Sequence, residues 1–516
     1  MICAHVGTVP HHVDRPTKDE SPGRDLSVLA RTATIFLDPA LNVLWRQQNT
    51  IVNVLNCMPA DLWDISETRN EGDTEFIVTI SPKRAIKPID WERASFYSRR
   101  VKLLNIDEEC WFKTLDFFEA ISLCPPGDFI FPNLERLNWC PEPSTSFQHV
   151  RLFLAPRITN LSLGPIHSIA HLSILSSLAS RFPSLSNFVV DIHCVPISVV
   201  TPSISSLVRA FISLETVYVP ALDKPAFAHV AQLPGLRSLA LSSDEAPLYG
   251  LDSSSASVQF PALTSLSMPS MKHAAALLVT LANWSLTCFT SEQSDQSAAT
   301  ARQLYAALAD HCSHCLLRNL SIRGGVFGTS AIPTATQLAI YSIGADIIRP
   351  LLSFSNLVTV WLSHPVGFDL DDAMIRDMAS AWPSIEVLHL TADVTYRHRY
   401  SRVTLEGIYA FAKHCPRLDN LDITFDATFV PKIRVKGKKR VFQRTLRIID
   451  VAASPISQPT RVAKFLSTIF PRLMSINTLF EDLAYGDHDD EEAVIDPHVR
   501  ELHEVWMEVL DDLVTS

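Results

Sequence analysis

The sequence has no long apolar run. No stretch approaches 18 consecutive apolar residues, and residues 1–24 contain proline, histidine and charged residues without a continuous apolar segment. A membrane-spanning helix needs about 20 apolar residues, and a signal peptide needs an apolar core of its own. We therefore expect neither a secreted chain nor a membrane partner.

The sequence also lacks a disulfide framework, because its ten cysteines are scattered over 516 residues. Disulfide-stabilised domains belong to oxidising compartments, so this cysteine usage favours a reducing one and predicts a cytoplasmic location. The densest group of metal-ligating residue types is His311-Cys312-Ser313-His314-Cys315. Ligands so close in sequence do not readily surround one tetrahedral ion, and no second group follows at the usual spacing. The favoured interpretation is a helix end that runs into a strand.

Motifs for nucleotide or acyl chemistry are missing as well. The sequence contains no G-x-x-x-x-G-K-S/T, no G-x-G-x-x-G and no G-x-S-x-G, so it predicts no phosphate-binding loop and no serine-nucleophile turn. No Ser/His/Asp or Cys/His set stands out from the eighteen histidines. We therefore predict no enzyme activity, no catalytic residue, no cofactor and no metal.

The formal net charge is −11, which argues against nucleic acid as a partner. One local exception is the basic run KGKKR at 436–440. Such a run is typical of a nuclear import signal or a phosphate-binding patch, and equally of a solvated hairpin tip. A nuclear location therefore stays open beside the cytoplasmic one.

What the chain does have is a recurring nine-residue phrase. The phrase reads φ-Pro-x-Leu-x-x-Leu-x-Leu, with φ apolar, and one clear copy is FPALTSLSM at 260–268. Its first apolar anchor recurs from Val101 to Leu473 in steps that average about 28–29 residues, a period typical of a leucine-rich-repeat solenoid. The predicted anchors are Val101, Leu134, Ile158, Leu185, Leu214, Leu236, Leu263, Leu286, Leu317, Leu357, Ile385, Leu418, Leu446 and Leu473.

Each phrase predicts a short strand, because Leu-x-Leu alternation places two apolar side chains on one face. Helix-like stretches such as TARQLYAALADHC (300–312) and TLEGIYAFAKHC (404–415) lie between the phrases. One repeat buries too few apolar side chains to fold alone, so neighbours must stack. The predicted fold class is α/β, a leucine-rich-repeat solenoid with strands on the concave side and helices on the convex side.

Residues 25–58 predict helices before the repeats. Leu26 and Leu29 share one helical face, while Asp38 and Pro39 suit the cap and first position of a second helix. Three apolar residues share a face of that second helix: Leu41, Leu44 and Trp45.

Two segments carry a family resemblance. DLSVLARTATIFLDPALNVLWRQ (25–47) resembles the second half of the F-box in a large family of fungal F-box/leucine-rich-repeat proteins, and WERASFYSRRVKLLNI (91–106) resembles the phrase that leads into that family's first repeat. The resemblance implies a helical module that binds the Skp adaptor of a cullin-type ubiquitin ligase. The adaptor-binding residues that it implies are Leu26, Leu29, Pro39, Leu41, Leu44 and Trp45.

The family's F-box opens with a Leu-Pro-x-Glu-Ile/Leu phrase that residues 1–24 do not contain. Either the gene model lacks an upstream exon or the F-box is degenerate. Two functions therefore stay open: a substrate-recognition subunit of a Skp–cullin–F-box ubiquitin ligase, or a non-catalytic repeat scaffold that does not bind the Skp adaptor.

Both functions use the concave face, where side chains between the apolar strand positions would meet an unknown target protein. Aromatic and arginine side chains are enriched in binding hot spots. The predicted target-binding residues are Tyr218, Arg318, Arg323, Trp361, His389 and Asp422. The alternative for these side chains is packing against neighbouring strands.

The predicted domain organisation has five parts. They are a disordered N-terminus (1–24), a partial F-box-like helical segment (25–60), a linker or N-terminal cap (61–98), the leucine-rich-repeat array (99–480), and an acidic loop with a C-terminal capping helix (481–516).

Overall fold

The computed structural model describes residues 22–69, 76–106, 115–141, 144–245, 260–280, 283–292, 297–323, 335–392, 401–432, 441–481 and 497–515. They divide between two compact units, Met1–Leu236 and Arg237–Ser516. Most of the predicted disordered segment 1–24, the KGKKR run at 436–440 and most of the predicted acidic loop lie outside the described residues. Among the described helices, none combines the length and apolarity needed to cross a bilayer.

The repeat phrases form parallel strands joined by a regular hydrogen-bond ladder. Within each unit, the residue after an anchor offers its carbonyl to two N–H groups of the next repeat. The Arg318 carbonyl, for example, accepts from Val358 N at 2.8 Å and from Thr359 N at 3.0 Å. Every predicted anchor from Val101 to Leu473 is buried. These observations confirm the α/β leucine-rich-repeat fold and the burial predicted for the anchors.

In the first unit the parallel strands follow in the order β1 (Gln47–Gln48), β4 (Leu103–Ile106), β5 (Arg136–Trp139), β6 (Asn160–Ile166), β7 (Asn187–Ile192) and β8 (Thr216–Val219). Its helices are α2 (Pro22–Thr32), α3 (Thr34–Leu44), α4 (Val52–Leu55), α5 (Trp91–Ser98), α6 (Leu115–Leu123), α7 (Ile169–Leu172), α8 (Leu175–Arg181), α9 (Ile197–Ala210) and α10 (Lys224–Gln232), with 3-10 turns η1 (Pro88–Asp90) and η2 (Ser144–Leu152). An antiparallel hairpin, β2 (Trp63–Arg69) with β3 (Phe76–Pro82), precedes α5.

In the second unit the parallel strands follow in the order β9 (Ser238–Leu241), β10 (Ser265–Met268), β11 (Cys288–Glu292), β12 (Asn319–Arg323), β14 (Thr359–His364), β16 (Val387–Ala392), β17 (Asn420–Ile423), β18 (Ile448–Asp450) and β19 (Ser475–Asn477). Its helices are α11 (Met271–Leu278), α12 (Ala298–His311), α13 (Ala335–Tyr341), α14 (Ala345–Ile348), α15 (Asp372–Ala381), α16 (Leu405–His414), α17 (Pro459–Ile469) and α19 (Pro497–Thr515), with the 3-10 turn η3 (Arg349–Ser353). Two short strands, β13 (Ile343–Gly344) and β15 (Phe368–Asp369), pair separately.

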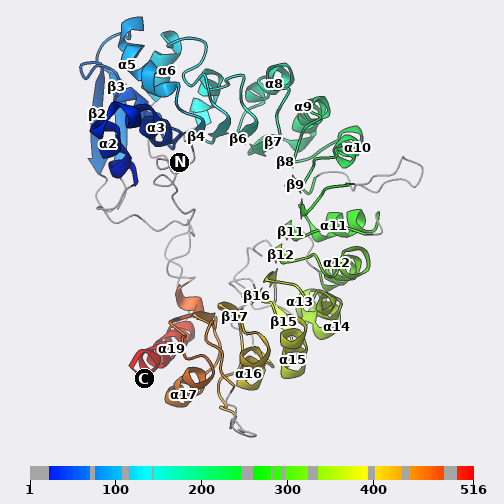
Figure 1. Cartoon of the computed structure of the whole chain (residues 1–516). Coiled ribbons are helices and arrows are strands. Elements are labelled where there is room, and N and C mark those ends of the chain that lie inside the picture. The colour runs from blue at the N-terminus through cyan, green and yellow to red at the C-terminus, as the bar shows by residue number, and fades with distance from the viewer. Residues whose placement is uncertain are drawn as a thin grey trace. The chain divides into compact units, whose positions relative to one another are not determined.

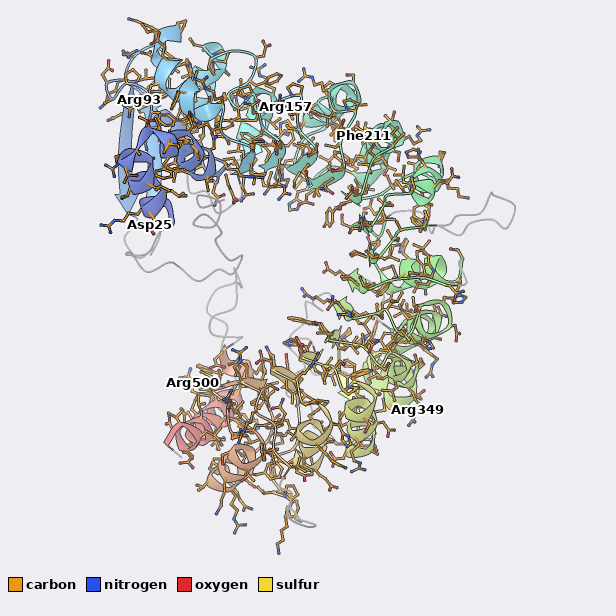
Figure 2. All side chains as sticks on the ribbon, viewed as in Figure 1. Asp25, Arg93, Arg157, Phe211, Arg349 and Arg500 are labelled. Atoms are coloured by element: carbon orange, nitrogen blue, oxygen red, sulfur yellow. The ribbon has the colours of Figure 1, made fainter. Side chains whose placement is uncertain are left out.

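Within each unit the helices between successive strands, such as α8, α9 and α10 in the first and α11, α12 and α15 in the second, lie on the outer side of the row of strands (Figure 1). Apolar side chains such as Phe211 fill the layer between strands and helices, whereas Arg157 and Arg349 are exposed (Figure 2). The described helices leave the opposite, inner face of each row of strands uncovered (Figure 1). This uncovered face is the surface on which a partner can meet the strands.

The sheet of the first unit starts before the predicted array. The Arg46 carbonyl accepts from Lys102 N at 2.8 Å and Leu103 N at 2.9 Å, and β1 pairs with β4. Trp45 therefore occupies the anchor position of one further repeat, and its ring stacks on Tyr97 with centroids 4.6 Å apart. The F-box-like segment is thus continuous with the repeat sheet.

The predicted helix start at Asp38 and Pro39 is wrong. Helix α3 begins at Thr34, and Pro39 lies inside it. Its first turn closes when Phe36 N donates to Ala33 O at 3.0 Å, so the helix is already formed before the proline. Asp38 does not cap this helix, because its Oδ1 pairs with Arg100 Nη2 at 2.6 Å.

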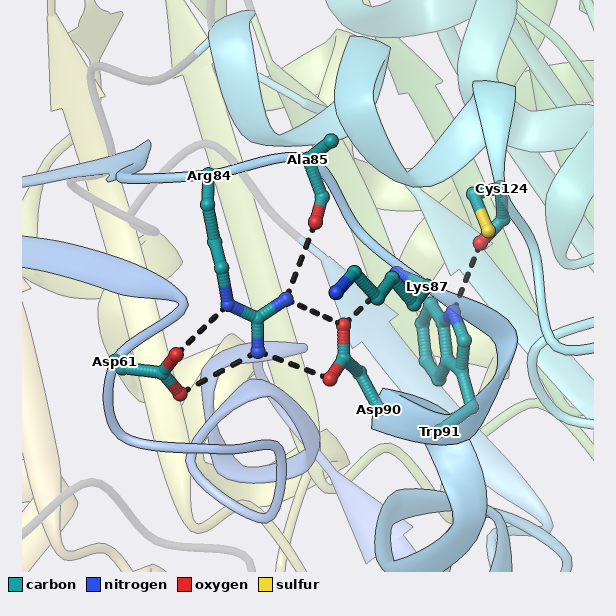
Figure 3. A network of polar contacts seen from close by, with 7 residues as sticks. All are labelled: Asp61, Arg84, Ala85, Lys87, Asp90, Trp91 and Cys124. Carbon is teal, nitrogen blue, oxygen red and sulfur yellow. Dashed lines mark hydrogen bonds and ion pairs between the residues drawn. The ribbon is translucent and has the colours of Figure 1, made fainter.

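Arg84 holds the segment between the hairpin and α5 in place (Figure 3). Its Nε lies 2.8 Å from Asp61 Oδ2, and its Nη1 lies 2.8 Å from Asp90 Oδ2. Asp90 is 5% exposed, and the hydrogen bonds from Arg84 lower the pKa of its carboxyl to about 2. Trp91 Nε1 donates to Cys124 O at 2.8 Å. The charged network therefore joins Asp61, Arg84 and Asp90 within residues 61–98, and the Trp91 hydrogen bond joins this segment to Cys124, just after α6.

At the other end of the chain, α19 packs on the last repeats of the second unit. Val499 and Leu502 join a buried cluster with Ala453 and Leu479. Trp506 is fully buried, and its Nε1 donates to Ser454 O at 2.9 Å. The helix thereby covers apolar surface that the last repeat would otherwise expose to water.

Candidate protein-binding surface

The strands of the second unit align one side chain per repeat in a column on the uncovered face. These side chains stand between two buried positions of each strand, so alternation directs them away from the helices. We call them the facing column of the second unit. In register order they are Ala240, Ser267, Thr290, Ser321, Trp361, His389, Asp422, Asp450 and Asn477.

Four predicted target-binding residues meet on neighbouring strands of this face. The Arg323 guanidinium carbon lies 4.2 Å from the centroid of the Trp361 ring, a cation–π distance. On the next strand, the His389 ring stacks on Trp361 with centroids 4.1 Å apart and an interplanar angle of 12°. His389 Nδ1 lies 3.2 Å from Asp422 Oδ2. The contacts thus form one chain: Arg323, Trp361, His389 and Asp422.

This chain of contacts holds its side chains in place before any partner arrives. The side chains of His389 and Asp422 are only 12% and 8% exposed, so their pair is largely shielded from water. Trp361 is half-buried between a cation and an imidazole and keeps part of its ring accessible. Binding through side chains that are already ordered costs less conformational entropy than binding through mobile ones. The arrangement suits a rigid aromatic contact flanked by groups of both charges.

The other two predicted target-binding residues lie elsewhere. Arg318 is exposed at the start of β12, where its backbone is part of the hydrogen-bond ladder. Tyr218 lies in the first unit, at the end of that unit's own facing column, and is 36% exposed. The facing column of the first unit consists of Asn105, Asn138, Ser162, Val189 and Tyr218.

Asp450 was not among the predicted site residues, although it extends the facing column beyond Asp422. Its Oδ1 accepts from Ala452 N at 2.8 Å. The signal was present in the weak copy of the phrase at 445–451, where Asp450 stands between Ile449 and Val451. Without the strand pairing, that copy does not distinguish an inward from an outward residue.

The residues that the F-box resemblance implied for adaptor binding mostly lie inside the helical pair α2–α3. Leu26 belongs to a buried cluster with Ala30 and Ala40, and Leu29 and Leu44 pack against that cluster. Leu41 is also buried. Trp45 stacks on Tyr97, whereas Pro39 is exposed.

The apolar side chains that α2 and α3 expose to solvent are different ones, namely Val28, Ile35 and Leu37. Ile35 is 75% exposed, which is unusual for so large an apolar side chain. Helical periodicity predicted the buried face correctly but gave no reason to single out these three residues.

The His311–Cys315 segment has the predicted structure. Helix α12 ends at His311, and Cys312 is buried at its C-terminal end. Burial raises the pKa of the Cys312 thiol to about 12, and His314 Nε2 lies 2.7 Å from Ala309 O. In the part of the chain that the structure describes, no group of three or more His, Cys, Asp or Glu residues is arranged to hold a metal ion.

No protein-family model matches the chain, and no curated protein matches it. Among solved structures the chain is similar to an internalin from Listeria monocytogenes, with 11% identity and a TM-score of 0.29 over 82% of this chain and 88% of that chain. It is also similar to the leucine-rich-repeat-containing protein LegL7 from Legionella pneumophila, with 13% identity and a TM-score of 0.26 over 72% and 96%. With TM-scores below 0.5, the fold assignment stands on the ladder and the buried anchors.

Proposed function

We propose that the chain is a non-catalytic protein-binding receptor, and that the facing column of the second unit holds its target protein. The observation that carries the proposal is the stacked chain of contacts from Arg323 through Trp361 and His389 to Asp422. Arginine and tryptophan are the residue types most enriched in binding hot spots, and here they are already ordered by one another.

The remainder of the column supports a protein partner. On one side of Trp361 the column continues with small side chains, Ser321 and Thr290. On the other side it continues with acids, Asp422 and Asp450. A surface that changes from small and polar to aromatic and then to acidic recognises an extended segment by shape and charge together.

The direct test selects a binding peptide for the wild-type chain from a displayed peptide library and measures its affinity by calorimetry. We expect Trp361→Ala to weaken binding about thirtyfold or more, because truncation of a hot-spot tryptophan costs about 2 kcal/mol or more. The matched control is Phe429→Ala, an exposed aromatic residue of the same unit outside the column. Equal affinities for wild type and Trp361→Ala would show that the column is not the binding surface.

A more specific form of this protein-binding function is that of the substrate-recognition subunit of a Skp–cullin–F-box ubiquitin ligase. Its supports are the F-box resemblance of residues 25–47 and the exposed apolar side chains Val28, Ile35 and Leu37 on α2 and α3. On this proposal the helical pair docks on the Skp adaptor while the facing column holds the target. The competing function is a scaffold that binds its target and never meets the adaptor.

A pull-down with purified Skp adaptor separates these two functions. The double variant Ile35→Asp/Leu37→Asp changes exposed residues and should therefore fold normally, yet it should lose the adaptor. The matched control is Ile169→Asp/Val199→Asp, which changes exposed apolar residues elsewhere in the first unit. Adaptor binding that is absent from the folded wild type, or unchanged in the Ile35/Leu37 variant, favours the scaffold.

A further inference from the structure

The most basic part of this acidic chain lies close to the C-terminal end of the repeats. Residues 432–447 read KIRVKGKKRVFQRTLR, with eight lysines and arginines and no acid, in a chain whose net charge is −11. Three of the eight, Lys432, Arg444 and Arg447, lie in the described residues, and the two arginines lie on the way into β18.

These two arginines line an open pocket of about 570 Å³ together with Arg472 from the next repeat. Arg444 and Arg472 are exposed, and the Arg444 guanidinium carbon lies 4.9 Å from the centroid of the Phe442 ring. The acid in the pocket lining is Asp419. The pocket therefore carries a net charge of about +2, since one of three guanidinium groups is balanced.

Asp419 does more than neutralise charge. Arg447 Nε lies 2.5 Å from Asp419 Oδ1, and Arg447 Nη2 lies 2.9 Å from Asp419 Oδ2. This bidentate pair raises the pKa of Arg447 and fixes the plane of its guanidinium. The Nη1 edge of Arg447 takes no part in that pair. A positioned donor edge between two exposed arginines matches a group that has several acceptor oxygens.

The hydroxyl of Thr445 does not contribute a donor to the pocket, because its Oγ1 lies 3.0 Å from Pro416 O and 2.9 Å from Leu418 O. The other lining atoms come largely from apolar residues, Pro471, Leu473 and Met474, and Met474 is exposed. Guanidinium groups beside an exposed apolar side chain suit a peptide that carries an anionic residue next to an apolar one.

We propose that this pocket binds a phosphorylated serine or threonine of a partner protein. A phosphate offers three acceptor oxygens and a charge near −2, which fits the net charge of the lining. Nucleic acid fits less well, because Asp419 and the apolar lining interrupt the continuous positive surface that a phosphate backbone requires. The pocket lies outside the facing column, so its test is independent of the proposed function.

The experiment offers the full chain a phosphoserine peptide library with degenerate flanking positions, and the same library with serine in place of phosphoserine. We expect the wild type to retain the phosphorylated library at least tenfold better. Arg444→Ala/Arg472→Ala should abolish that preference. The matched control is Arg461→Ala/Lys464→Ala, which removes two exposed cations from α17 in the same unit.

Circular dichroism checks that both double variants are folded, which is expected because all four side chains are exposed. The proposal is overturned if the two libraries are retained equally, or if Arg444→Ala/Arg472→Ala keeps the preference of the wild type. A single-stranded oligonucleotide serves as competitor. If it displaces the retained phosphopeptides at a lower concentration than free phosphoserine peptide does, the pocket belongs to a nucleic-acid surface instead.

Discussion

The two units build their strands in the same way but present different side chains on the uncovered face. In the first unit the facing column is uncharged, with amide side chains at Asn105 and Asn138. In the second unit the column includes an aromatic pair and two acids, Trp361, His389, Asp422 and Asp450, before its last residue Asn477. The buried anchors behind both columns are alike, since all are apolar.

The comparison separates what fixes the fold from what is free to vary. The anchors and the ladder carbonyls repeat in both units because each repeat must bury its apolar side chains against the next. The facing side chains contribute little to that burial, so they can change from amides to aromatic and charged groups. Specialisation of the second unit's column is therefore compatible with an unchanged scaffold.

The largest expected effect on stability is the difference between truncating a buried side chain and truncating a facing side chain of the same strand. Leu320 is fully buried, and Leu320→Ala should cost about 2–5 kcal/mol of unfolding free energy through lost burial and a cavity. Its neighbour Ser321 is in the facing column, and its buried Oγ has no hydrogen-bond partner among the residues that the structure describes. Ser321→Ala should therefore change stability by less than about 0.5 kcal/mol. Denaturant unfolding of both variants measures the contrast, and similar losses would contradict it.

The next effect concerns how helices are capped in each unit. Asp372 in the second unit caps the helix of the following repeat, accepting from Thr404 N and Oγ1 at 2.7 Å each and from Gly407 N at 3.1 Å. Asp223 in the first unit caps its own helix through Ala226 N at 2.7 Å. Asp372→Ala should cost about 2–3 kcal/mol and Asp223→Ala about 1 kcal/mol. The reverse order in thermal or denaturant unfolding would show that Asp372 does not link two repeats.

A pH effect of similar size distinguishes the units. His364 in β14 is fully buried beside Tyr305, with Nε2 2.6 Å from the Tyr305 hydroxyl, and burial lowers its pKa to about 3. The unfolded chain binds this proton below about pH 6.5, while the folded chain does not, so stability falls as the pH drops from about 6.5 towards 3. At pH 5 the loss from His364 alone should be about 2 kcal/mol.

Asp90 in the first unit acts in a lower pH window. Its pKa is lowered to about 2 by Arg84, so its contribution to folding stability is present above about pH 4 and is lost as the pH falls towards 2.

Burial also lowers the pKa of His149 and His171 in the first unit. A variant of His364 is therefore needed to assign the loss of stability between pH 6.5 and 5 to that residue. His364→Asn keeps a partner for Tyr305 but does not titrate. If its stability falls between pH 6.5 and 5 as steeply as that of the wild type, the attribution to His364 is wrong.

The smallest effect is expected at Tyr218, which closes the facing column of the first unit and is 36% exposed. Tyr218→Ala should cost less than about 1 kcal/mol of stability. It should also leave the affinity for a target selected on the wild type within about twofold, because Trp361 and His389 belong to the other column. A loss of affinity as large as that of Trp361→Ala would show that residues of both units belong to the binding surface.

The sequence predicted the repeating part of the fold well. Every anchor follows from a local pattern, and helices α12 and α16 follow from apolar spacing of 3–4 residues. Strand β1 escaped prediction because Gln47 and Gln48 have no apolar alternation and pair only through the backbone. The Arg84 network was not predicted because it joins Asp61 and Asp90, which no local sequence pattern relates.

The candidate site could be predicted only in part, for the same reason. Trp361 and His389 were found because strand alternation places them on the open face. The contact of Arg323 with Trp361 is diagonal between strands, and it depends on a register that the sequence leaves open by one residue. For α2, periodicity identified an apolar face with Leu26 and Leu29. It does not say whether such a face packs inside the chain or against a partner.

The most direct test of the central claim is a hydrogen-exchange comparison of the chain with and without a bound target. We predict slower amide exchange in β12, β14, β16 and β17, which carry Arg323, Trp361, His389 and Asp422, and unchanged exchange in β4 to β8 of the first unit. Slowing confined to the first unit, or to the helices behind the second unit's strands, would contradict the assignment of the facing column as the binding surface.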